Sequence, residues 1–182
     1  MGVIDTELRY GLALKEDSQI LMGNGVGQNL SGLIPNSTAY AAPFAPAAPT
    51  MLDTVGLGML QTTLADFIPT GIVMHPSDWM RIRLLKNADG EYLLGEPGAQ
   101  VDPRLFGLPV VATTSMPVDK FLIGAFPQAA TVYDRWSPRV EVSTEHADFF
   151  TRNMVAILCE ERLGLAVKNE AALVYGDFGN VT

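Results

Sequence analysis

The residues with the most reactive side chains in this sequence are one cysteine, Cys159, and two histidines, His75 and His146. A cysteine nucleophile needs a nearby base, usually a histidine, so a cysteine-dependent hydrolase is one interpretation. Cys159 ends an apolar run, however, which is typical of a buried cysteine that acts as a small apolar residue. His75 precedes a proline, which favours a helix cap, and His146 lies in a polar stretch exposed to solvent. The sequence therefore supports a hydrolase only weakly.

Metal and phosphate sites have still less support. One cysteine and two histidines cannot complete a closed zinc site of these residue types. The glycines of residues 23–27 follow a helical pattern, whereas a phosphate-binding loop follows a strand, and the Gly-Lys-Ser/Thr ending of such a loop is missing. These glycines are typical of a helix end and a turn. We expect no cofactor and no metal.

Two adjacent carboxylates, Glu160 and Glu161, directly follow the apolar run. A carboxylate at the edge of a buried layer needs a partner, and Arg162 or another neighbour would supply a salt bridge. Strand alternation places Glu160 and Arg162 on one face and Glu161 on the other. The two carboxylates are therefore not a natural acid–base pair.

The composition predicts a folded protein whose surface is partly covered by partners. The 182 residues suffice for one domain, or for two small lobes around a shared core. Charged residues make up 18% of the chain, below the roughly 25% of an ordinary soluble domain. The net charge of -8 disfavours a free-standing nucleic-acid reader.

The sequence gives no indication of a membrane protein or a disulfide framework. Apolar runs fall short of the roughly 20 residues that span a bilayer. Asp5 and Glu7 stand where a signal peptide needs an apolar core. One cysteine cannot form a disulfide within the chain. We expect a protein that is made in a reducing cytoplasm and has no membrane partner.

Hydrophobic periodicity predicts a first helix over residues 4–22, apolar on two faces and so covered on both sides. Residues 36–50 are small and rich in proline, which predicts an extended boundary between two lobes. Thr50 then caps a second helix, with Asp53 in the capping box, and this helix ends before Pro69.

A third helix is predicted over residues 75–86, because proline is favoured at the first helical position. Short β-rich runs bounded by Gly, Pro and Asp predict strands around it. The first set comprises residues 72–74, 91–94, 108–113, 121–126 and 130–135. From Trp136 the pattern changes, and a second sheet is predicted from residues 139–143, 154–159, 163–167 and 171–178.

Three stretches matter together because of their order and spacing. They are residues 10–33; residues 71–79 with 84–86 and 107–111; and residues 133–135, 140–143 and 153–163. In this order they resemble the major capsid proteins of tailed bacteriophages with the HK-97 fold, over essentially the whole chain. The first stretch is similar to the end of the family's long spine helix and the glycine-rich turn after it.

The resemblance implies an α+β fold with two lobes. A peripheral lobe, with the spine helix and a long antiparallel sheet, would comprise residues 1–34 and 136–182. An axial lobe, a mixed sheet with flanking helices, would comprise residues 35–135. Contacts among neighbouring subunits would also explain the low charge, since large obligate interfaces bury much surface.

The function implied is that of a structural subunit of an icosahedral phage or prophage head, without enzymatic activity. Its partners would be copies of itself in pentamers and hexamers, with scaffold, protease and portal proteins during assembly, and DNA enclosed without being read. The protein would lie in the host cytoplasm and then in the virion. A same-fold alternative is an encapsulin-type nanocompartment shell that holds cargo enzymes.

Family members carry an N-terminal arm and an extended loop before the spine helix, and Met1 corresponds to a position inside that helix. We expect these parts to be missing from this chain, and the 182 residues alone to form monomers or small oligomers. In one branch of the family a lysine of the extended loop forms an isopeptide bond with an asparagine, assisted by a glutamate. The matching positions are Asn153 and Glu160, which we interpret as a remnant crosslinking site that is inactive in this chain alone. Trp136 stands where that branch has a smaller residue.

Overall fold

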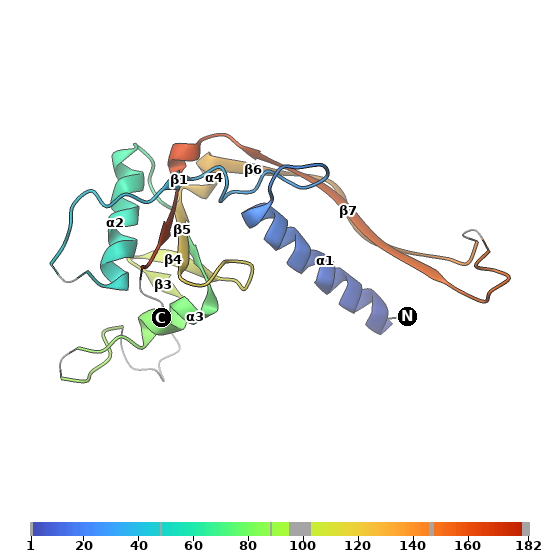
Figure 1. Ribbon diagram of the computed structural model, residues 1–182, viewed down its shortest axis with the longest axis horizontal. Helices are drawn as coiled ribbons and strands as arrows, with labels where there is room; N and C mark the ends of the chain where they lie inside the picture. The colour runs from blue at the N-terminus through green and yellow to red at the C-terminus, as the bar shows by residue number, and fades with distance from the viewer. Residues whose placement is uncertain (1, 48, 88, 95–102, 146–147, 180–182) are drawn as a thin grey trace.

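The computed structural model describes residues 2–47, 49–87, 89–94, 103–145 and 148–179. It has two parts, a mixed sheet with helices around it and a long two-stranded ribbon with one helix beside it (Figure 1). The elements, in chain order, are α1 (Gly2–Met22), β1 (Thr38–Ala39), α2 (Met51–Leu64), β2 (Gly71–Met74), α3 (Pro76–Arg83), β3 (Arg104–Leu105), β4 (Leu108–Ala112), β5 (Lys120–Gly124), α4 (Phe126–Ala129), β6 (Ala130–Ser143), β7 (Ala156–Val167), a 3-10 turn (Glu170–Ala172) and β8 (Leu173–Asp177).

The mixed sheet has six strands in the order β1-β8-β5-β2-β4-β3. β1 runs parallel to β8 and β2 runs parallel to β4, while the other neighbours are antiparallel. Alternate residues of its central strands face two different core clusters. Ile72 and Phe121 pack with residues of α2 and α3, whereas Val73 and Leu122 pack with Leu21 at the end of α1. The sheet is therefore buried on both faces.

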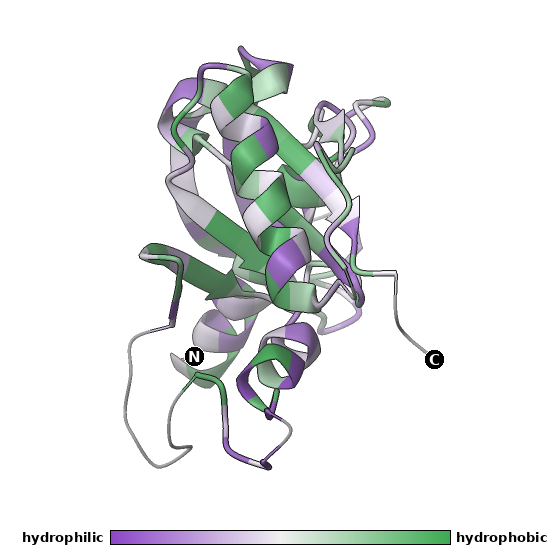
Figure 2. Ribbon diagram, turned by 90° about the vertical axis from the view of Figure 1, so that its left-hand side faces the viewer, coloured by the Kyte–Doolittle hydropathy of each residue, from purple (hydrophilic) through white to green (hydrophobic). Residues whose placement is uncertain are grey.

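The second helix, α2, covers one face of this sheet, and Figure 2 shows apolar residues along its length. Thr50 accepts a hydrogen bond from the backbone of Asp53, whose side chain accepts one from the backbone of Thr50, so the predicted capping box is confirmed. A Cβ atom on Gly58 would lie 2.9 Å from a methyl carbon of Ile123. The glycine in the helix therefore permits close contact with β5.

The glycines after α1 form the predicted helix end and turn. Gly25 and Gly27 both have a φ of 67°, in the left-handed region that glycine adopts without strain. A Cβ atom on Gly23 would lie 2.3 Å from the carbonyl oxygen of Leu30, so only glycine fits there. The turn folds the chain back against the C-terminal end of α1.

The ribbon of β6 and β7 extends away from the mixed sheet, with α1 along its inner part (Figure 1). The two strands pair antiparallel from Ala130 opposite Val167 to Ser143 opposite Ala156. Register shifts occur on both sides of Trp136. Such irregularities bend a strand and redirect its side chains.

The assignment of residues 171–178 to a second sheet is wrong. β8 pairs with β5 and β1 inside the mixed sheet, and its Leu173 and Val174 are buried there. Gly176 allows this pairing, since a Cβ atom at that position would lie 2.4 Å from the ring of Phe121. The local apolar pattern predicts a buried strand correctly but does not identify its neighbours.

Other element boundaries also differ from the prediction. No strand forms over residues 91–94, because Asn87 accepts a hydrogen bond from the backbone of Glu91 and closes a turn. The third helix ends at Arg83 rather than at residue 86. The change of pattern at Trp136 marks the irregularities within β6 and not the start of a new strand.

Among the residues that the structure describes, the first helix of the single chain is not covered on both sides as expected. Leu21 is the buried residue of α1, while Val3, Tyr10 and Leu14 are exposed within the part of the chain that the structure describes. The helix contacts β6 and β7 on one side only (Figure 1).

Candidate functional site: the layer of α1 and the β6–β7 ribbon

The outer part of the ribbon exposes apolar side chains on a structure two strands wide. Val142 and Ile157 lie opposite each other, and both are more than 40% exposed. Phe150, in the turn between the strands, is 81% exposed. The apolar run ending at Cys159 predicts a buried strand, but in the single chain Val155, Ile157 and Leu158 are exposed and Cys159 is only half-buried. Exposed apolar surface of this kind marks interaction sites.

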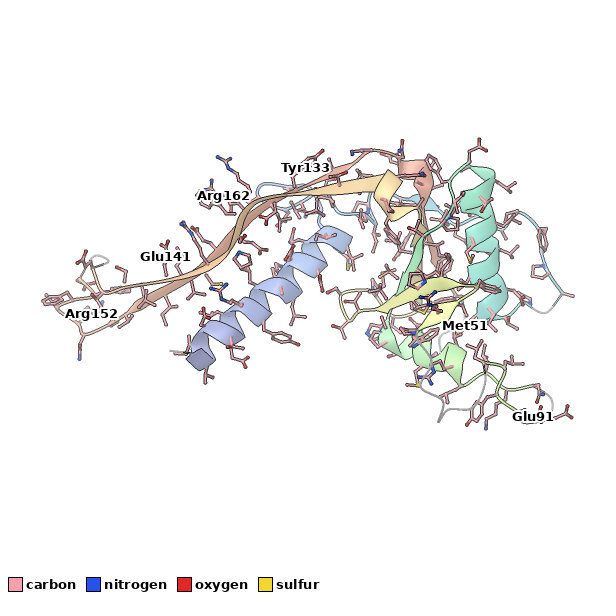
Figure 3. All side chains as sticks on the ribbon, turned by 180° about the vertical axis from the view of Figure 1, so that it is seen from behind. Met51, Glu91, Tyr133, Glu141, Arg152 and Arg162 are labelled. Carbon is pink, nitrogen blue, oxygen red and sulfur yellow. The ribbon has the colours of Figure 1, made fainter. Side chains whose placement is uncertain are left out.

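A cluster of arginines around Trp136 lies at the bend of the ribbon. The guanidinium groups of Arg139 and Arg162 lie 4.8 Å and 4.3 Å from the centre of the indole ring, within cation–π range. Arg139 donates from Nε to Oε1 of Glu160 at 2.9 Å and pairs with Glu141 at 3.2 Å. Figure 3 shows Glu141, Arg162 and Tyr133 along the ribbon, beside α1.

Arg139 of β6 lies directly opposite Glu160 of β7 in the ribbon, and the two side chains form an ion pair. This pair confirms the predicted salt bridge to a neighbour. The hydrogen bond that Arg139 donates to Glu160 raises the pKa of Arg139 above its ordinary value. The carboxylate of Glu160 is therefore neutralised by a cation of its own chain.

A groove of about 930 Å³ lies between α1 and the ribbon. Both Glu161 and the Glu160 of the Arg139 pair line this groove, and burial raises the pKa of Glu161, helped by the charges of Glu16 and Asp134. The residues that line the groove are Leu12, Lys15, Glu16, Gln19, Gln28, Asn29, Leu30, Tyr133, Arg135, Glu160, Glu161, Arg162, Leu163 and Gly164.

The two residues of the predicted crosslinking remnant lie on different parts of the hairpin. Glu160 lies within β7 and contacts Arg139. Asn153 lies in the turn before β7, exposed, with a φ of 53° and its backbone N–H donated to Phe150. From Ala156, where β7 begins, to Glu160 the strand advances about 13 Å. Their expected role stays a prediction.

The histidine and cysteine of the alternative hydrolase interpretation also lie on separate elements. His75 caps α3, beside the mixed sheet, and its Nδ1 accepts a hydrogen bond from the backbone of Ser77 at 3.1 Å. Cys159 lies in the ribbon opposite Val140. His146 lies outside the described residues. His75 therefore functions as the predicted cap and lies on a different element from the thiol.

Within the described residues, no group of three or more His, Cys, Asp or Glu side chains could hold a metal ion. Among the same residues, no helix is both long enough and apolar enough to cross a membrane. The prominent features of this layer are the exposed apolar surface of the ribbon, the groove beside α1 and the ion pairs of Arg139.

Comparison with known proteins gives these surfaces a context. A family model described as "Phage capsid family" matches residues 1–178. The chain belongs to the phage capsid family. It is 42% identical, over 177 residues, to the major capsid protein of Enterobacteria phage HK97, a match that covers 97% of this chain and 46% of that protein. The chain thus spans less than half the length of this capsid relative.

Solved phage capsid structures have the same fold. The capsid of an empty GTA particle matches with a TM-score of 0.79 at 22% identity, covering 98% of this chain and 66% of that one. A structure from Gordonia phage Cozz matches with a TM-score of 0.75 at 16% identity, covering 97% and 62%. The predicted α+β capsid fold of the HK-97 type is confirmed.

An encapsulin-type shell is not favoured, because the family model and the 42% identical relative both describe phage capsid proteins. A virus-like particle from Pyrococcus furiosus matches with a lower TM-score of 0.61 at 15% identity, covering 91% of this chain and 64% of that one.

Sequence reasoning missed two features of this layer. It did not predict that the guanidinium groups of both Arg139 and Arg162 would lie over the ring of Trp136, or that the charge of Glu16 in the first helix would act on Glu161. Glu160 pairs with Arg139, whereas the charges of Glu16 and Asp134 act on Glu161, although both carboxylates line the groove. Their partners could not be identified, because the register of the ribbon and the position of α1 depend on residues far apart in the sequence.

Proposed function

We propose that this chain is part of a structural subunit of a phage or prophage icosahedral head, which self-assembles through its two lobes and encloses DNA without reading it. The 42% identity to a phage major capsid protein over 97% of the chain carries this proposal. The exposed apolar ribbon and the low charge support it, since both fit a subunit covered by its neighbours. The subunit is not an enzyme.

The proposed partners are copies of the same protein in pentamers and hexamers, with scaffold, protease and portal proteins during assembly. The proposed location is the virion, with the host cytoplasm before assembly. A net charge of -8 supports enclosure without tight binding, because an acidic inner wall repels the phosphate backbone.

We also propose the two-lobe division predicted from the sequence, with two adjustments: residues 130–135 join the peripheral lobe with the rest of β6, and residues 173–177 join the axial lobe. α1 and the β6–β7 ribbon would form the peripheral lobe, and the mixed sheet with α2 and α3 would form the axial lobe. The pairing of β8 with β5 supports assigning residues 173–177 to the axial lobe.

The experiment that tests the function is a chimera. The matching 177-residue region of the HK97 major capsid protein is replaced by this chain, and the product is examined by electron microscopy. Closed icosahedral particles are the expected result. A folded, soluble chimera that forms no shells would contradict the proposal. A separate prediction concerns the 182 residues alone, which should form monomers or small oligomers. Uniform shells formed by this chain alone would contradict the prediction of monomers or small oligomers.

Asn153 and Glu160 are proposed as a remnant crosslinking site that is inactive in this chain alone. The ion pair of Glu160 with Arg139 supports inactivity, since the carboxylate already accepts hydrogen bonds from a guanidinium of its own chain and is engaged away from an incoming ammonium group. Denaturing gels should show a single band at the size of the chain. A covalent ladder that disappears on Glu160→Gln would refute the inactivity.

A further inference from the structure

One dipeptide in the turn after α1 brings two groups together that can react with each other. Asn24-Gly25 is the only Asn-Gly pair in the sequence, and both residues are exposed. The backbone nitrogen that follows an asparagine can attack the amide carbon of the asparagine side chain. Glycine has no Cβ atom, so it leaves this nitrogen unshielded. The reaction needs no enzyme, and the surroundings of the two atoms therefore decide whether it occurs in the folded chain.

The reaction is a substitution at Cγ of Asn24. The backbone nitrogen of Gly25 loses its proton to solvent and forms a bond to Cγ, and the bond from Cγ to Nδ2 breaks. The leaving nitrogen takes up a proton from solvent and departs as ammonia, which leaves a cyclic imide, a succinimide. Water then opens this ring at one of its two carbonyl carbons. The product is either aspartate or isoaspartate, in which the backbone runs through the former side chain.

Hydrogen bonds hold the side chain of Asn24 and polarise its carbonyl group. Oδ1 of Asn24 accepts one hydrogen bond from the backbone of Val26 at 3.1 Å and another from Nδ2 of Asn29 at 2.8 Å. Two donors on a carbonyl oxygen stabilise the negative charge that develops there when the carbon is attacked, as in an oxyanion hole. The electrophile is therefore activated in the folded chain.

The nucleophile, in contrast, is blocked in the folded chain. The backbone N–H of Gly25 donates to the carbonyl oxygen of Leu30 at 2.8 Å, so its proton is held by the turn. Gln19 keeps Leu30 in place, because Oε1 of Gln19 accepts from the backbone of Leu30 at 3.2 Å and its Nε2 donates to Asn29 at 3.3 Å. A net hydrogen bond of this kind slows a step that needs the free amide by up to about tenfold.

We propose that Asn24 is a site of spontaneous deamidation, which the closed turn protects and an open turn exposes. The activated carbon is not attacked while the Gly25 amide stays bonded to Leu30, so the blocked nucleophile decides the rate in the folded chain. Local opening of the turn releases the nitrogen. This modification needs a single chain and no neighbour, so it is independent of the proposed function.

The two products differ in their effect on the turn. Aspartate keeps an oxygen at the place where Oδ1 accepts its two hydrogen bonds, so the turn can close again. Isoaspartate adds a carbon to the backbone between residues 24 and 25 and displaces the Gly25 amide from Leu30. Gly23 leaves no room for this shift, because a Cβ atom there would lie 2.3 Å from the carbonyl oxygen of Leu30. The isoaspartyl chain therefore loses the closed turn at the end of α1.

Peptide mapping by mass spectrometry tests the site. The chain is incubated at mildly alkaline pH, once folded and once in concentrated urea, and conversion of amide to acid is followed at each asparagine. In urea we expect Asn24 to react first. In the folded chain its rate should be at least about fivefold lower. Equal rates in the two states, or faster reaction of another asparagine in urea, would refute the proposal.

Gln19→Ala tests the protection within the folded state. The substitution removes the side chain that holds Leu30 and leaves Asn24 and Gly25 unchanged, so deamidation should be at least about threefold faster than in the wild type. Gln28→Ala is the matched control. Gln28 is exposed in the same turn, and its side chain makes no hydrogen bond among the described residues. It should react at the wild-type rate.

Equal rates in these two variants would show that the bond from Gly25 to Leu30 does not protect the site. If Gln19→Ala fails to fold, the comparison of folded and urea-unfolded wild type decides alone. Thermal unfolding then compares the separated isoaspartyl chain with Asn24→Asp. The isoaspartyl chain should melt at least about 2 °C below the wild type, and Asn24→Asp close to it. Equal melting temperatures for all three would refute the predicted effect on the turn.

Discussion

Glu160 and Glu161 adjoin in the chain but lie in different surroundings. Glu160 accepts a hydrogen bond from the guanidinium of Arg139, whereas the charges that act on Glu161 include a carboxylate of α1. Strand alternation predicts this separation from the sequence alone. Which groups lie near each carboxylate depends on the positions of β6 and α1 relative to β7. Those positions are set by residues far from Glu160 and Glu161 in the sequence.

Gly176 shows how one missing side chain permits a strand pairing. A Cβ atom there would lie 2.4 Å from the ring of Phe121 and 2.7 Å from the Cβ atom of Tyr40. We expect Gly176→Ala to reduce the free energy of unfolding by about 1–3 kcal/mol, because the aromatic cluster would have to shift. Thermal or urea unfolding measures this difference.

Gly164→Ala is the matched control for that substitution. Gly164 lies in β7, and a Cβ atom there would have no neighbour within 4 Å. Stability should be unchanged or slightly higher, since alanine restricts the unfolded chain. Equal losses in the two variants would show that the contact with Phe121 does not matter.

At the scale of the element, the start of α2 is determined by its own sequence. Thr50 and Asp53 form reciprocal hydrogen bonds that satisfy the first backbone donors of the helix. We expect Thr50→Ala to cost about 1 kcal/mol of stability. Thr63→Ala, near the other end of the same helix, should have little effect. Loss of stability in the second variant alone would contradict the capping argument.

Helices and buried strands were the most predictable elements, because caps, glycine turns and apolar runs are local signals. Thr50, His75 and the glycines after Met22 all act as the sequence indicates. The misassigned elements depend on distant partners. β8 joins the mixed sheet through β5, about fifty residues earlier in the chain, and no local pattern specifies that pairing.

At the scale of the whole molecule, the ribbon is where the burial predicted from the sequence differs from the burial observed in the single chain. The apolar run that ends at Cys159 predicts burial, and the chain by itself leaves much of that run exposed. The first helix shows the same disagreement at Val3 and Tyr10. The sequence predicts that apolar residues of the ribbon and of the first helix are buried. Both predictions agree with the proposal that these surfaces are buried against other copies of the subunit.

Ile157→Lys tests this interpretation of the ribbon. Ile157 is already 44% exposed in the chain, so a lysine there should change the stability of the chain by no more than about 0.5 kcal/mol. In the chimera with the HK97 protein, the buried charge should reduce shell formation strongly. Shells in normal yield, from a chimera with unchanged melting temperature, would show that this face is not an interface.

The outermost strands of the mixed sheet, β1 and β3, are two residues long. A long unpaired strand edge acts as a template that recruits strands from other molecules, and natural proteins often protect against this by shortening the edge strand. The mixed sheet therefore offers almost no template for indiscriminate growth. A chain with such short edge strands is in this way protected from aggregating through its own core sheet.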